Sequence, residues 1–135
     1  MRIGELAERA GVSTRALRHY EELGLLPARR AANGYRAYGA EDLRAVAEIR
    51  TLVGLGLSLE ETRPFVECLR AGHPTGGSCA SSIAVYRQKL AEVDASLARL
   101  GAVRAELETQ LQEALRERAP EPRCGLTPVF TPEGT

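Results

Sequence analysis

The sequence is poor in the residue types that enzyme active sites and disulfide scaffolds commonly use. Its 135 residues include two histidines and three cysteines. With so few histidines, no phosphate-binding loop and no paired acid and base, the chain gives little support for an enzyme. An odd number of cysteines without marks of secretion disfavours a disulfide scaffold and favours reduced thiols or metal ligands.

The sequence also lacks a long apolar run and an overall charge. No run approaches the roughly 18 residues of a membrane span, and MRIGELAERAG begins like an amphipathic helix rather than a signal peptide. We therefore expect a soluble, cytoplasmic protein without a membrane partner. The formal net charge is zero, but residues 1–38 carry seven arginines against four glutamates. The basic excess thus lies at the front of the chain.

The first forty residues have the pattern of a winged helix-turn-helix. Apolar residues recur at helical spacing over 3–10, Gly11 closes this helix, and Ser13 is placed to cap a second helix, TRALRHYEEL. Two short helices around a tight turn form a helix-turn-helix. The following RRAANGYRAYG contains Asn33-Gly34, the strongest short hairpin signal, and predicts a basic β-hairpin wing.

A second helix pair and a break follow the wing. The apolar spacing predicts a helix over 40–54, and the later segment SLEE has the spacing of a capping box. Pro64 lies inside the helix that this box opens and is expected to kink or split it. The stretch CLRAGHPTGGSC, residues 68–79, then ends the helix. Its cysteine and histidine spacing is a weak metal signature by itself, and we interpret 73–79 as a hinge.

The last helical segment is long and has a seven-residue repeat. From 80 to 118 there is no proline, and the repeat predicts one helix roughly 58 Å long with two apolar seam positions. Nothing else in the chain is large enough to cover this seam, so we expect a second copy of the chain as partner. Arg104 occupies a seam position, and an antiparallel pair places it across from Asp94, which favours that orientation. Residues 119–135 carry four prolines and predict an irregular tail.

These elements together indicate a mainly α-helical, DNA-binding protein, because a helix fits the major groove and a basic hairpin reaches the phosphates. The segments IGELAERAGVS, RALRHYEELGLL, NGYRAY and LGLSLEE, with the long terminal helix, resemble the mercury-resistance-type (MerR) transcription regulators. The resemblance implies a winged-helix domain over 1–72, a dimerisation helix over 80–118 and a possible effector loop over 119–135. It also implies a homodimer joined by an antiparallel coiled coil.

The resemblance further implies how such a dimer works. Each winged helix binds one half of an inverted-repeat operator in a promoter. An effector then switches the promoter by bending and untwisting the DNA, which lets RNA polymerase start transcription, so the chain is expected to be an activator.

Particular residues are implied as DNA contacts. Arg15 and Arg18 are the leading pair, one to a base edge and one to a phosphate, and Tyr20 and the wing residues clamp the DNA backbone. Each arginine could instead be a solvated charge, Tyr20 a core residue and His19 a helix filler. The implied set is Ser13, Thr14, Arg15, Arg18, His19, Tyr20, Arg36 and Tyr38.

We expect the effector to bind or react at cysteine residues. Metal-responsive members of this family carry one cysteine at the start of the dimer helix, where Cys79 lies, and usually two in the loop after it, where Cys124 stands alone. Cys79 and Cys124 of the other chain would bind a thiophilic metal ion or form an intersubunit disulfide. Cys68 and His73 would add ligands if the helix turns them inward; otherwise Cys68 is a buried apolar residue and His73 is solvated.

Two alternatives remain open. The effector could be a small organic ligand bound between the dimer helix and the helix that contains Pro64. The chain could also be an architectural DNA-binding protein without an effector, although its long dimer helix argues against this. A four-cysteine iron–sulfur cluster, found in redox-responsive members, is excluded by the count of three cysteines.

Overall fold

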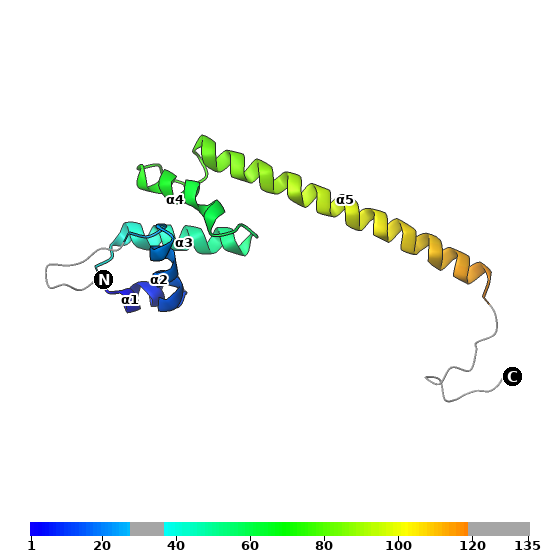
Figure 1. The fold of residues 1–135 in the computed structure, drawn as a ribbon, viewed down its shortest axis with the longest axis horizontal. Helices are drawn as coiled ribbons and strands as arrows, with labels where there is room; N and C mark the ends of the chain where they lie inside the picture. Colours follow the sequence, from blue (N-terminus) through cyan, green and yellow to red (C-terminus); the bar gives the residue numbers. More distant parts are fainter. Residues whose placement is uncertain (28–36, 119–135) are drawn as a thin grey trace, which may run out of the picture. The chain divides into compact units, whose positions relative to one another are not determined.

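The computed structural model describes residues 1–27 and 37–118. Residues 28–36, which contain most of the predicted hairpin and Arg36, and the predicted tail, including Cys124, lie outside the described residues. The described part is helical and contains no strand (Figure 1). Its elements are α1 (Ile3–Ala10), α2 (Thr14–Glu22), α3 (Ala40–Gly54), the 3-10 helix η1 (Glu60–Thr62), α4 (Arg63–Arg70) and α5 (Ala80–Arg116). The mainly α-helical class is therefore confirmed.

Helices α1 and α2 form the predicted helix-turn-helix, and local capping fixes where each begins and ends. Gly11 ends α1 in a left-handed conformation and donates its amide back into the helix at 2.9 Å. The hydroxyl oxygen of Ser13 accepts the amide of Ala16 at 3.0 Å, so Ser13 is the N-cap of α2 as predicted. The Arg50 guanidinium of α3 donates to the Ala10 carbonyl oxygen at 3.1 Å, which ties the end of α1 to α3.

The core of the DNA-binding end is built from the apolar faces of α1, α2 and α3. Leu6, Leu17 and Ile49 are completely buried there. A neighbouring cluster centres on Phe65 of α4, whose ring packs edge-to-face on Tyr86 of α5 with 4.9 Å between ring centroids. Burying one such side chain contributes roughly 1.5–3 kcal/mol. The aromatic contact therefore attaches the start of α5 to α4.

Pro64 splits its helix as predicted, into η1 and α4. It lies in the first turn of α4, where the missing amide breaks no helical hydrogen bond. The predicted capping box is also present: the Glu61 amide donates to the Ser58 hydroxyl oxygen at 3.2 Å, and the Ser58 amide donates to the Glu61 carboxylate at 2.8 Å. The buried Thr62 hydroxyl donates to the Leu59 carbonyl oxygen at 2.6 Å. Local hydrogen bonds thus fix the start of this helix pair.

The backbone at the end of the predicted wing is hydrogen-bonded to the N-terminus. The Tyr38 amide donates to the Met1 carbonyl oxygen at 2.8 Å, and the Met1 ammonium donates to the Tyr38 carbonyl oxygen at 2.6 Å. The Tyr38 side chain is buried in the core, and its hydroxyl donates to the Glu21 carboxylate. This burial favours a packing role for Tyr38 over the predicted contact with the DNA backbone.

The chain divides into two compact units, Met1–Glu92 and Val93–Thr135, and α5 contributes to both. None of the described helices is long and apolar enough to cross a membrane.

In α5, Arg104 pairs with Glu108 of its own helix at 2.8 Å. Large apolar side chains along the predicted seam are exposed in the single chain: Ile83, Tyr86, Leu90, Val93, Leu97, Leu100, Leu107 and Leu111. The dimer, and the pairing of Arg104 with Asp94 of a second copy, stay predictions.

Candidate functional site

One face of α2 is exposed and basic. Arg15, Arg18 and His19 are exposed, whereas Leu17 and Tyr20 of the same helix are buried. The helical period thus separates a core face from a free face. Within residues 1–27 and 37–118, neither Arg15 nor Arg18 takes part in an ion pair. Both guanidinium groups are therefore available to a phosphate or a base edge.

The other predicted contacts on α2 differ in how free their side chains are. Ser13 is exposed, but its hydroxyl oxygen already caps the helix, and Thr14 is half-buried. His19 Nδ1 lies 3.6 Å from Glu22 Oε1. Tyr20 is buried, and this burial raises the pKa of its phenol. For Tyr20 the structure favours core packing, the alternative that the sequence left open.

The predicted hinge between α4 and α5 forms a compact turn. Helix α4 ends in a Schellman motif, in which the His73 amide donates to the Cys68 carbonyl oxygen at 3.3 Å and the Gly72 amide donates to the Leu69 carbonyl oxygen at 3.0 Å. Gly72 has a φ of 99°, a conformation that glycine adopts without strain. The motif returns the chain so that His73 lies beside the last turn of α4.

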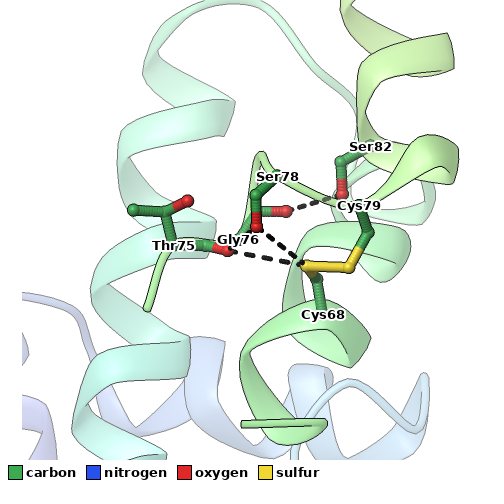
Figure 2. The surroundings of a disulfide bond; sticks show 6 residues. All are labelled: Cys68, Thr75, Gly76, Ser78, Cys79 and Ser82. Atoms are coloured by element: carbon green, nitrogen blue, oxygen red, sulfur yellow. Dashed lines mark hydrogen bonds between the residues drawn. A yellow bond between two sulfur atoms is a disulfide. The ribbon is translucent and has the colours of Figure 1, made fainter. Parts of the chain in front are cut away.

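Contacts from three helices hold the rest of this turn. The Ser82 hydroxyl of α5 is completely buried and donates to the Gly76 carbonyl oxygen at 2.6 Å (Figure 2). The Arg44 guanidinium of α3 donates to the Pro74 carbonyl oxygen at 3.3 Å. A Cβ atom at Gly76 would lie only 2.8 Å from the Phe65 carbonyl oxygen of α4, so this position has no room for a side chain.

The turn joins Cys68 to Cys79 in a disulfide bond (Figure 2). Their Cα atoms are 6.0 Å apart, within the usual range for a disulfide. The Cys68 sulfur also lies 3.5 Å from the Thr75 carbonyl oxygen and 3.7 Å from the Ser78 hydroxyl oxygen. Cys79 occupies the N-cap position of α5, because its carbonyl oxygen accepts the Ile83 amide at 3.0 Å.

This bond overturns one expectation from the sequence and leaves another untested. The pairing of Cys79 with Cys124 of another chain stays a prediction, because Cys124 lies outside the described residues. The odd cysteine count favours reduced thiols, whereas the structure bonds Cys79 to Cys68 of its own chain. The physical reason is that the glycine-rich turn reverses the chain within 11 residues, so the end of α4 meets the start of α5 without a second chain. Cys68 is buried as expected, yet it is bonded rather than merely packed.

Cys68, His73 and Cys79 also form a group that could hold a metal ion. Each contributes one ligand atom, and these atoms lie within 4.8 Å of one another. Cys68 is buried, Cys79 is half-buried and His73 is exposed, so the group opens to solvent. Two thiolates and an imidazole suit thiophilic ions such as Zn²⁺, not Mg²⁺ or Ca²⁺. The sequence predicts these residues as candidate ligands but does not show that they lie close together. The sequence feature that indicates the chain reversal is Gly72, which stands in the position that a Schellman motif requires.

Comparison with known proteins identifies the family. The model described as MerR HTH family regulatory protein matches residues 1–67, and the model described as MerR, DNA binding matches residues 43–110. The HTH-type transcriptional regulator HmrR of Rhizobium leguminosarum bv. viciae is 34% identical over 108 residues, which cover 80% of this chain and 81% of that protein. The chain belongs to the MerR family.

Solved structures of transcription regulators share the fold. The transcription regulator PbrR691 from Ralstonia metallidurans CH34, in complex with lead(II), matches with a TM-score of 0.65 and 29% identity over 93% of this chain and 92% of that chain. HiNmlR, a MerR-family regulator lacking the sensor domain and bound to promoter DNA, matches with a TM-score of 0.53 and 27% identity over 86% of this chain and 89% of that chain.

Membership of the MerR family settles the general activity. The chain is a DNA-binding transcription regulator and not an enzyme, and double-stranded DNA is its partner. The resemblance seen in the sequence is therefore confirmed. Helices α1 and α2, with the exposed arginines of α2, lie within the segment matched by the helix-turn-helix model.

Proposed function

We propose that this MerR-family regulator binds an inverted-repeat operator with α2 in the major groove. The observation that supports this best is the free basic face of α2, where Arg15 and Arg18 are exposed opposite the buried Leu17 and Tyr20. Arginine suits both bidentate contact with guanine and contact with phosphate. Arg15 contacts a base edge and Arg18 contacts a phosphate.

The remaining predicted contacts act around this pair. Ser13 and Thr14 lie at the N-terminal end of α2, where backbone amides face an anion favourably. His19 is exposed beside Arg18 and reaches the same groove. Arg36 of the predicted wing clamps the neighbouring phosphates. Tyr20 and Tyr38 support these contacts from the core.

A binding titration tests the assignment of α2. Anisotropy of a fluorescent duplex of mixed sequence is measured with the wild type, Arg15→Ala, Arg18→Ala and the control Arg87→Ala, which removes an exposed arginine of α5. Arg18→Ala should weaken binding to this duplex and Arg87→Ala should not. Equal affinity of the wild type and Arg18→Ala would contradict the assignment.

The operator requires two copies of the chain, which we propose pair through α5. Leu97 and Leu107 are 60% and 64% exposed in the single chain, so the seam is uncovered without a partner. An antiparallel pairing that brings Arg104 beside Asp94 of the second copy avoids facing like charges. In sedimentation equilibrium, Leu97→Glu should shift the protein toward the monomer, whereas Ala95→Glu, off the seam, should not. A monomeric wild type would contradict this pairing.

We further propose that the dimer switches promoters by bending and untwisting DNA for RNA polymerase, in response to a metal ion or thiol oxidation at Cys79. Cys124 belongs to the same proposal as a ligand or bonding partner. The support is that Cys79 immediately precedes α5 and already lies beside a second cysteine and a histidine. A promoter fusion tests this: Cys79→Ser should abolish the response to a thiophilic metal or to peroxide while DNA binding persists. An unchanged response in Cys79→Ser would contradict the role of Cys79, and a wild type that responds to neither agent would favour a small organic effector.

A further inference from the structure

We propose that Cys68, His73 and Cys79 of a single chain bind one Zn²⁺-type ion when the two thiols are reduced. Their three ligand atoms lie within 4.8 Å of one another. They come from three places in the chain: the last turn of α4, the turn that follows it, and the residue before α5. This ligand set lies within one chain and does not need Cys124. The inference deepens the proposed metal or thiol response, on which its regulatory meaning rests.

The backbone already holds the three residues in place. The hydrogen bond from the His73 amide to the Cys68 carbonyl oxygen fixes the first two relative to each other. The bond from the Ser82 hydroxyl to the Gly76 carbonyl oxygen fixes the turn against the start of α5, beside Cys79 (Figure 2). Metal binding therefore requires side-chain rotation and no refolding, which lowers its entropic cost.

The distances suit a tetrahedral ion. With Zn–S near 2.3 Å and Zn–N near 2.0 Å, tetrahedral ligand atoms stand about 3.7 Å apart. The three ligand atoms are within 4.8 Å of one another, and the two sulfurs are bonded in the oxidised form, so small rotations after reduction reach this spacing. Three protein ligands leave a fourth position for water, which can enter from the side of the exposed His73.

Two groups near the sulfurs can stabilise their charged form. The Ser78 hydroxyl oxygen lies 3.7 Å from the Cys68 sulfur and donates to the Thr75 carbonyl oxygen at 3.1 Å, so rotation of this hydroxyl would bring its proton to a thiolate. Cys79 stands at the N-terminus of α5, where the helix dipole stabilises a negative charge. Two thiolates balance the charge of one divalent ion, so the occupied site carries no net charge.

The disulfide and the metal site exclude each other, because both use the same sulfur atoms. Hydrogen peroxide oxidises the two zinc-bound thiolates, and an S–S bond forms as both Zn–S bonds break. The peroxide takes up two electrons from the sulfurs and two protons from the solvent and becomes two water molecules, and Zn²⁺ is released. The oxidised form is the one in which Cys68 and Cys79 are bonded. A cell thiol of the glutathione class restores the reduced form by thiol–disulfide exchange.

Metal binding to the reduced full-length chain tests the ligand set. Bound Zn²⁺ is counted per chain after dialysis, and Co²⁺ is added separately so that thiolate-to-cobalt charge-transfer absorption reports sulfur ligation. We expect one ion per chain in the wild type and in Cys124→Ser. Cys68→Ser and Cys79→Ser should lose the ion, and His73→Ala should weaken binding about tenfold or more. Peroxide should release the ion from the wild type and yield a disulfide.

His73→Ala should leave the fold intact, because this side chain is exposed and its backbone hydrogen bond remains. Weaker metal binding by this variant therefore cannot be ascribed to unfolding. Arg87→Ala, at an exposed residue of α5, is the control and should bind the metal ion like the wild type. Loss of the ion in Cys124→Ser, or equal binding in His73→Ala and the wild type, would overturn the single-chain site. Duplex binding is measured on the same samples. If the wild type binds the duplex but no metal ion, only this inference is refuted. If the wild type does not bind the duplex, the proposed function is refuted.

Discussion

The backbone amide of His73 donates to the carbonyl oxygen of Cys68 at 3.3 Å, and the chain between them turns at Gly72. This one hydrogen bond decides where the second histidine of the chain lies. It ends α4, places His73 beside Cys68 and starts the turn that brings Cys79 to the same point. Helix termination and the candidate metal site thus depend on the same local geometry.

Gly72→Ala should destabilise the chain by about 1–2 kcal/mol, because alanine is strained at a φ of 99°. Thermal unfolding measured by circular dichroism should show a lower Tm. Gly54→Ala is the matched control, because nothing lies within 4 Å of a Cβ atom there and its φ is not positive. Equal unfolding temperatures for the two variants would contradict the role of Gly72.

Air-oxidised protein should contain a Cys68–Cys79 link and a free Cys124, because the turn holds the first two side by side within one chain. Peptide mapping by mass spectrometry under non-reducing conditions identifies the linked peptides. A link between Cys79 and Cys124, in one chain or between two, would show that the intrachain pairing is wrong.

Arg18→Ala should reduce the salt dependence of DNA binding. The loss of one phosphate contact lowers the slope of log K against log salt concentration by about 0.9. The affinity is measured on one duplex over a series of salt concentrations. A slope equal to that of the wild type would remove Arg18 from the phosphate contacts.

The stability of Glu61→Gln should decrease less at acidic pH than the stability of the wild type. The amide of Ser58, and next the ammonium of Lys89 at 3.0 Å, hold the pKa of the Glu61 carboxyl below its ordinary value of 4.5. A lowered pKa in the folded state stabilises the protein above the unfolded value, and this stabilisation is lost as pH falls through the folded value. The effect is small, because the Glu61 side chain is only half-buried and salt screens its interactions.

The measurement is the Tm at pH values from 6 down to about 3, below the ordinary glutamate pKa. Below pH 4.5, the Tm of the wild type should decrease by more than the Tm of Glu61→Gln. Glu8→Gln, at an exposed position of α1, should follow the wild-type curve. Parallel curves for the wild type and Glu61→Gln would rule out the stabilising role of this carboxylate.

The features that the sequence predicted correctly are those fixed by neighbouring residues. Ser13 caps α2, and Ser58 and Glu61 form their capping box, because donor and acceptor stand three residues apart. Pro64 splits the helix because its ring and missing amide act on its own backbone. Such features need no knowledge of the tertiary fold.

The features that the sequence did not predict depend on contacts between distant residues. Tyr38 follows a basic hairpin pattern, yet its side chain is buried and bonded to Glu21, and its backbone pairs with Met1. Cys68 and Cys79 meet because the chain reverses at Gly72 and the turn packs closely on the Phe65 backbone at Gly76. Periodicity and spacing carry no signal for these contacts.

The central claim is that two copies of this chain read an inverted repeat through α2. A selection from random duplexes with the purified full-length protein, followed by sequencing, tests it most directly. The account predicts enrichment of a palindromic site with two symmetric halves, and loss of preference at one position in each half for Arg15→Ala. Enrichment of an asymmetric single site, or of no sequence at all, would contradict it.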